Sequence, residues 1–173
     1  LARAVCVAVI FAAGLAVASV TVAGQSAQPA QSIQSAQTSQ QQIRAWMTAG
    51  QWQKVADALE PGSARTAEEN YEYGAALAHL ERWPEAERHF EQALVMNERL
   101  GARVALAHTR HDYAAMLAAR GGVGARERAA TLLRASLEAA RAIGMRGLEA
   151  RAARRLDELS GAAAGTTDGP DEL

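Results

Sequence analysis

Small and large apolar residues recur at helical spacing through the middle of the chain. Ala86 is followed four positions later by Phe90 and, after three more positions, by Ala93. Residues at i, i+4 and i+7 lie on one face of an α-helix, so this pattern predicts a helix that buries one stripe of its surface. The same pattern returns farther along the chain, at Ala129, Leu133 and Ser136.

Proline and glycine divide this pattern into separate helices. Pro84 suits the first turn of a helix, where a missing N–H costs nothing, and Gly101, Gly121 and Gly144 suit helix ends. Runs of Val and Ile that are typical of strands do not occur beyond residue 24, so the predicted fold class is all-α. The expected helices cover residues 40–49, 52–60, 65–81, 84–99, 103–120, 126–143 and 146–159.

Two pairs of these helices repeat one another. Tyr73, Gly74 and Leu77 match three residues that lie 40 positions later, and the pattern of Ala86 and Phe90 returns after 43 positions. The difference of three falls in the loop "GGVGAR". One helical pair buries only part of its apolar surface, so it needs neighbouring pairs. The matching residues of the second pair are Tyr113, Ala114, Leu117, Ala129 and Leu133.

These positions resemble the tetratricopeptide repeat (TPR), a helix–turn–helix unit of 34 residues. The family's tryptophan near the start of the repeat is Asn70 here, and its proline near the end is Glu98. A second copy starts near residue 107 and an earlier partial copy covers 45–62. The repeat signature comprises Gly74, Trp83, Ala86, Phe90 and Ala93 in the first copy, and Ala114, Ala129, Leu133 and Ser136 in the second.

The resemblance implies a TPR-like solenoid of helical hairpins, with about 2.5–3 repeats and a C-terminal capping helix. The segments are also similar to the helical repeats at the C-terminal end of large bacterial ATPase-type and cyclase-type regulators. TPR proteins bind extended peptides in a concave groove that the first helix of each pair lines. Carried over position by position, this groove consists of Glu68, Tyr71, Ala75, Ala78, His79, His108, His111, Ala115, Ala118 and Ala119. We expect Tyr71, His79 and His111 to contact the partner.

Charge is unevenly distributed although the net charge is only −1. Residues 43–97 carry 5 basic and 9 acidic side chains, and residues 98–160 carry 12 basic and 7 acidic ones. This bias favours two solvated helical faces, and its alternative is a bipolar surface that pairs with a partner or with a second copy. The arginines are interspersed with acids and lack interleaved aromatic residues, so we expect no nucleic-acid partner.

The residues that usually carry chemistry are few. The single cysteine, Cys6, excludes a disulfide framework and a Cys-rich zinc site. His108, His111 and Asp112 share one helical face, but no fourth metal ligand is marked. His89 lies one helical turn from Glu85, and we interpret both as part of a solvated face. We therefore expect no enzyme, no catalytic residue, no cofactor and no metal.

The N-terminal segment is typical of an export signal. Residues 4–23 are uncharged and follow Arg3, and small residues precede a cleavage position after Gly24. The alternative is a retained anchor, because about 20 apolar residues suffice to span a bilayer. The predicted organisation is a signal peptide or membrane anchor at 1–24, a Gln-rich disordered linker at 25–39, the TPR-like domain at 40–160 and a disordered tail at 161–173.

The sequence thus predicts an exported, periplasmic or extracytoplasmic bacterial protein, with anchoring to the inner membrane by residues 4–23 as the alternative. Its predicted function is that of a non-catalytic scaffold or adaptor of the cell envelope, which binds a protein or peptide segment in the TPR groove. One alternative is a membrane-anchored assembly factor that self-associates as a homo-oligomer. Others are a metal-binding or enzymatic protein that uses the His-bearing groove, and a piece of a larger regulator.

Overall fold

The computed structural model describes residues 39–60 and 65–164 of the chain, with side chains as far as residue 161. These residues form seven helices and no strand, which confirms the all-α prediction. A helix at 39–48 is followed by α2 (Trp52–Leu59), α3 (Ala67–His79), α4 (Trp83–Leu100), α5 (Arg103–Arg120), α6 (Ala125–Ala142) and α7 (Arg146–Ala164). The main difference from the expected boundaries is that α7 continues beyond residue 159.

The predicted signal peptide or anchor lies outside the described residues, as do nearly all of the linker and most of the tail. Within the part of the chain that the structure describes, no helix combines the length and the apolar character needed to cross a membrane.

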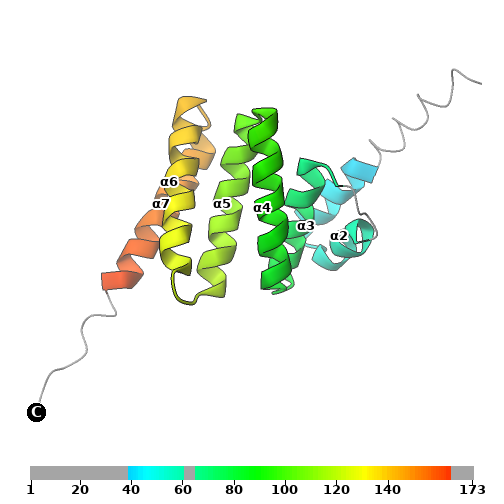
Figure 1. Cartoon of the computed structure of the whole chain (residues 1–173), viewed down its shortest axis with the longest axis horizontal. Helices are drawn as coiled ribbons and strands as arrows, with labels where there is room; N and C mark the ends of the chain where they lie inside the picture. The colour runs from blue at the N-terminus through cyan, green and yellow to red at the C-terminus, as the bar shows by residue number, and fades with distance from the viewer. Residues whose placement is uncertain (1–38, 61–64, 165–173) are drawn as a thin grey trace, which may run out of the picture. The chain divides into compact units, whose positions relative to one another are not determined.

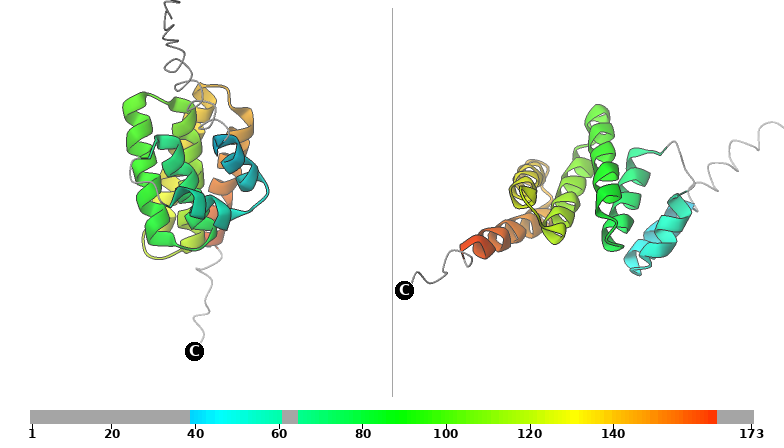
Figure 2. Two further views of the ribbon diagram at one scale, coloured as in Figure 1. Left: turned by 90° about the vertical axis from the view of Figure 1, so that its right-hand side faces the viewer. Right: turned by 60° about the horizontal axis from the view of Figure 1, so that its bottom comes forward.

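Each helix from α2 to α7 packs on the next one along the chain (Figure 1). Turns of two to four residues join the helices from α3 onward, and such short turns make successive helices antiparallel. In addition, α3 contacts α5, and α5 contacts α7. Further views show the same succession of neighbouring helices (Figure 2). The first helices of the predicted pairs therefore contact one another directly.

Local sequence signals define the helix ends. At the start of α3, the Thr66 hydroxyl accepts a hydrogen bond from the Glu69 N–H, and the Glu69 carboxylate accepts one from the Thr66 N–H. This capping box satisfies two backbone donors that the first turn leaves without helical partners. At the other end of the same hairpin, α4 stops at Gly101, which has the left-handed conformation that glycine adopts easily.

Close approach of α3 and α4 depends on Gly74. A Cβ atom at this position would lie 3.3 Å from the Phe90 nitrogen and 3.4 Å from the Ala86 oxygen, both of them backbone atoms. Ala86 itself is completely buried. In the second pair, the corresponding residues Ala114 and Ala129 are also completely buried. Small residues therefore lie at each predicted helix contact.

The core between the two pairs is centred on Phe90. Its ring stacks on Tyr113 at a centroid distance of 5.4 Å, and Tyr71 lies edge-on at 6.3 Å. Phe90 and Tyr113 are each 1% exposed. Full burial of one large apolar side chain contributes about 1.5–3 kcal/mol to the free energy of folding, so these rings contribute much of the stability of the contact between the two helical pairs. Ser136 adds a buried hydrogen bond of 2.8 Å from its hydroxyl to the Ala107 carbonyl oxygen, which joins α6 to α5.

The prediction that His89 lies on a solvated face is wrong. His89 is only 8% exposed, and its Nδ1 lies 2.9 Å from the Asn70 Oδ1. Its ring also meets Tyr73 edge-on at 4.7 Å. The physical reason is that Asn70 on α3 is also buried, and a buried amide requires a polar partner, which the His89 ring supplies. Burial lowers the pKa of His89, which favours the neutral imidazole at this contact.

Glu72 is a buried carboxyl between α3 and the helix at 39–48. It is 2% exposed, and the Gln40 amide donates to both of its oxygens at 3.1 Å. Burial, with a further contribution from the charge of Glu68, raises the pKa of Glu72 to about 7. An exposed glutamate has a pKa of about 4.3, so the folded chain binds this proton more tightly than the unfolded chain.

The contribution of Glu72 to the stability of the domain should therefore be fully present below about pH 4.3 and be lost as the pH rises to about 7, because ionisation of Glu72 is disfavoured in the folded state. Glu72→Gln replaces the carboxyl by a neutral group of the same shape. We expect this variant to exceed the parent in stability by about 1–3 kcal/mol at about pH 8, and to equal it near pH 4. Urea unfolding followed by circular dichroism at both pH values measures this difference. A difference that does not change with pH would contradict the assignment.

Candidate functional site

Most of the predicted groove residues of α3 and α5 line two neighbouring hollows. The first, which we call the aromatic hollow, has a volume of about 490 Å³. The second, which we call the apolar hollow, has a volume of about 1130 Å³. Tyr71 lines both hollows and therefore marks the point where they meet.

The aromatic hollow combines a floor of small residues with a wall of rings and thioethers. Its alanines come from α3 and α5, its rings from α2, α3 and α4, and its charged residues from the α3–α4 turn, α5 and α7. The lining consists of Ala75, Ala78, Ala115 and Ala119; Trp52, Tyr71, His79, Trp83 and Phe90; Met47 and Met116; and Glu81, Asp112 and Arg155.

The apolar hollow lies at the opposite ends of the same helices. Leu100 and Val104, at the turn between α4 and α5, contribute apolar surface and are 72% and 55% exposed. Glu68 and His108 line it as well, and Arg44 from the helix at 39–48 forms an ion pair with Glu68.

The structure thus distributes the predicted groove residues between two places. Tyr71, Ala75, Ala78, His79, Ala115 and Ala119 line the aromatic hollow, whereas Glu68 and His108 line the apolar hollow. Ala118 is exposed but lines neither hollow. His111 is 5% exposed and lines neither, so no contact surface for a partner is left on its side chain. The binding role of the other residues stays a prediction.

A hydrogen-bonded bridge connects α3 to α5 at the wall of the aromatic hollow. The Tyr71 hydroxyl donates to Asp112 Oδ2 at 2.6 Å, and His111 Nδ1 lies 2.7 Å from Asp112 Oδ1. Burial acts to raise the pKa of Asp112, but the hydrogen bonds from His111 and Tyr71 outweigh it and hold that pKa below its usual range. Burial and the charge of Asp112 raise the pKa of Tyr71, so its phenol stays a donor. The bridge therefore carries an ionised carboxylate.

A second ring contact forms the opposite side of the hollow. The Trp52 and His79 rings stack at a centroid distance of 3.8 Å with an interplanar angle of 6°. Burial lowers the pKa of His79, which favours its neutral form at pH 7. This stack fixes the end of α3 against α2 and presents a flat ring surface.

The sequence does not indicate the role of several residues of the hollow. Its pattern marks Asp112 only as a potential metal ligand, whereas the structure shows that Asp112 bridges α3 and α5. The repeat spacing of 40 residues places Tyr71 opposite His111, and this spacing was the available signal that the neighbouring Asp112 would meet Tyr71. No sequence signal pointed to Glu81 or to Arg155.

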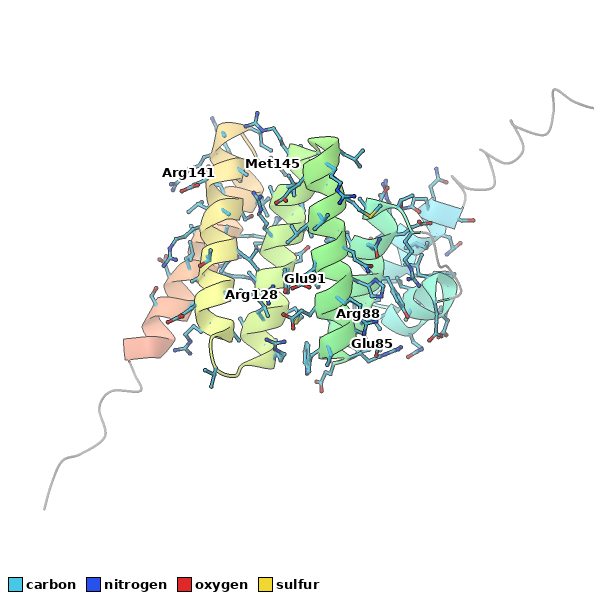
Figure 3. All side chains as sticks on the ribbon, in the orientation of Figure 1. Glu85, Arg88, Glu91, Arg128, Arg141 and Met145 are labelled. Carbon is cyan, nitrogen blue, oxygen red and sulfur yellow. The ribbon has the colours of Figure 1, made fainter. Side chains whose placement is uncertain are left out.

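Part of the charge bias is neutralised by ion pairs within the chain. On the face opposite the hollows, Glu87 pairs with Arg120 and Arg128, and Arg128 also pairs with Glu91 at 2.6 Å. Arg128 on α6 and Glu91 on α4 extend toward one another (Figure 3). Acids of the first half thereby neutralise arginines of the second half.

Across residues 39–60 and 65–164, no three or more His, Cys, Asp or Glu side chains are arranged to hold a metal ion.

Comparison of the chain with protein-family models, with curated proteins and with solved structures gives no match.

Glu81 has an unusual backbone conformation beside the aromatic hollow. Its φ is +58°, and every other described residue with a positive φ is a glycine. A side chain in this left-handed region costs about 1–2 kcal/mol because Cβ approaches the following carbonyl oxygen.

Glu81→Gly should remove this strain and stabilise the domain by about 0.5–1 kcal/mol, after the greater freedom of glycine in the unfolded chain is subtracted. Glu81→Ala is the matched control, since it removes the carboxylate but keeps a Cβ in the strained conformation. Urea unfolding of the two variants measures the difference. Equal stability of the glycine and alanine variants would show that the backbone here is not strained.

Proposed function

We propose that this chain is a non-catalytic scaffold or adaptor of the TPR type, which binds an extended segment of another protein along the two hollows. The observation that carries this proposal is the position of the aromatic hollow. It lies on α3 and α5, at the residues through which TPR proteins hold peptides, and it is walled by rings over a floor of alanines.

The packing of the helices supports a TPR-type arrangement. Contacts run from α3 to α5 and from α5 to α7, as they do when the first helices of successive hairpins line one face. The small residues Gly74, Ala86, Ala114 and Ala129 are buried at the helix contacts. These are the positions at which the repeat pattern requires small side chains.

The size and lining of the hollows suit a peptide segment. Volumes of about 490 and 1130 Å³ are in the range of typical ligand sites, which extends from about 300 to 1,000 Å³, or exceed it slightly. The alanine floor lets a backbone approach closely, while the rings supply apolar contact area for side chains. Because Tyr71 lines both hollows, one extended segment could occupy them in succession.

Self-association through opposite charges is the weaker alternative. It is favoured by an acidic first half and a basic second half, but Arg120 and Arg128 of the second half already pair with Glu87 and Glu91 of the first half. We propose an envelope location on the basis of the apolar segment at 4–23, with anchoring by that segment as the alternative.

Filling the aromatic hollow should abolish partner binding. Ala119 is exposed on α5 and lines the hollow, so Ala119→Tyr introduces a ring that occupies the space of the partner. Ala142→Tyr, at the exposed end of α6, is the matched control. Affinity purification from crosslinked envelopes of the native host should recover partners with the parent and the control, but not with Ala119→Tyr. If a folded Ala119→Tyr variant retains every partner, the groove assignment is wrong.

A further inference from the structure

The contact between the helix at 39–48 and α3 is built around a buried carboxyl group. Glu72 on α3 is 2% exposed, and the amide of Gln40 donates to both of its oxygens at 3.1 Å. An amide satisfies the hydrogen bonds of a carboxyl group but supplies no positive charge to a carboxylate. A buried charge without an opposite charge beside it is costly, so this contact favours the protonated form of Glu72.

The charges around Glu72 do not compensate for its ionisation. Arg44 is the one charged residue of the helix at 39–48, and it forms an exposed ion pair with Glu68. Glu68 and Glu69 lie on α3 beside Glu72, and their negative charges oppose its ionisation, whereas the charge of Arg44 favours it. The contact thus holds more carboxyl groups than cations. The charged residues of α2, which also packs on α3, are exposed: Lys54 and Asp57.

Docking of the helix at 39–48 is therefore linked to the binding of a proton. Burial and the charge of Glu68 raise the pKa of Glu72 to about 7, whereas an exposed glutamate has a pKa of about 4.3. The stabilising contribution of Glu72 to docking is fully present below about pH 4.3 and is lost as the pH rises through about 7. Such a pKa difference corresponds to a decrease in the docking equilibrium constant by about a hundredfold between pH 4 and pH 8.

The helix at 39–48 has few other contacts that hold it in place. Within this helix only Ile43 is buried, and Trp46 and Met47 are partly buried against the core. Isolated helices shorter than about 12–15 residues are marginal in water, so this helix depends on its contacts with the rest of the domain. A change in the charge of Glu72 therefore acts on a weakly held element.

Both hollows include a residue of this helix in their lining. Met47 lines the aromatic hollow, and Arg44 lines the apolar hollow. Release of the helix at 39–48 from α3 would remove one lining residue from each hollow. The position of this helix therefore determines the shape of the inner face.

We propose that the helix at 39–48 docks on α3 while the Glu72 carboxyl is protonated and leaves α3 when this group ionises, which changes the lining of both hollows. The helices from α2 to α7 stay packed, because each of them contacts the next one along the chain. This inference goes beyond the proposed function, since it concerns the chain alone and holds whether or not a partner binds.

Hydrogen–deuterium exchange followed by mass spectrometry tests this proposal on the full chain. The parent is compared with Glu72→Gln at the same pH, so the intrinsic chemical exchange rates cancel. At about pH 8 we expect peptides from residues 40–48 to exchange at least about tenfold faster in the parent, and at about pH 4.5 the two proteins should agree within about threefold. Peptides from α5 and α6 should exchange alike in both proteins.

Glu138→Gln is the matched control, because Glu138 is exposed on α6. It should exchange like the parent over residues 40–48 at both pH values. Equal exchange of the parent and Glu72→Gln at about pH 8 would show that this proton does not control docking, and the proposal would fail. Faster exchange of the parent over all helices would show opening of the whole domain, which overturns the release of one helix.

The parent alone supplies a second measurement, which decides the question if Glu72→Gln does not fold. Division of each observed rate by the intrinsic rate at the same pH gives the protection of residues 40–48. This protection should decrease at least about tenfold between pH 4.5 and pH 8, while that of α5 stays constant. Constant protection of residues 40–48 would overturn the proposal.

Discussion

The hydrogen bond between Tyr71 and Asp112 is the constraint on which the inner face of the domain depends. It connects α3 to α5 at 2.6 Å, and His111 holds the other oxygen of the same carboxylate. Tyr71 in turn lies edge-on to Phe90, which stacks on Tyr113 in the core. The spacing of the two inner helices is therefore set by a polar contact at the surface and a ring stack beneath it. Together they keep the aromatic hollow open.

The carboxylates on the two faces of the domain have different partners. On the outer face, Glu87 and Glu91 hold Arg128 beside the Tyr113 ring, so the charges join α4 to α6 and are neutralised within the chain. On the inner face, Asp112 is held by the Tyr71 phenol and the His111 imidazole, and no arginine or lysine in the part of the chain that the structure describes pairs with it. Exposed ion pairs contribute little stability, so the main effect of the outer network is to position α4, α5 and α6 relative to one another.

The sequence was sufficient for the helices and for the small residues between them, because periodicity, Pro84 and Gly101 are local signals. It also identified Tyr71 and His79 as residues of the hollow. It failed where a side chain depends on a partner from another helix. Whether His89 is buried depends on Asn70, which lies 19 residues earlier, and the role of Asp112 depends on a phenol 41 residues earlier. Such pairings require the relative placement of the helices, which composition and periodicity do not specify.

The central claim is that the partner segment lies in the aromatic hollow, on the inner helices rather than on the outer ones. Site-specific photocrosslinking in the native host tests this most directly. A photoreactive residue replaces either Ala78 on α3, which lines the hollow, or Arg134 on α6, which is exposed outside both hollows. The account predicts a discrete crosslinked product from position 78 and none from position 134. A product from position 134 and none from position 78 would contradict it.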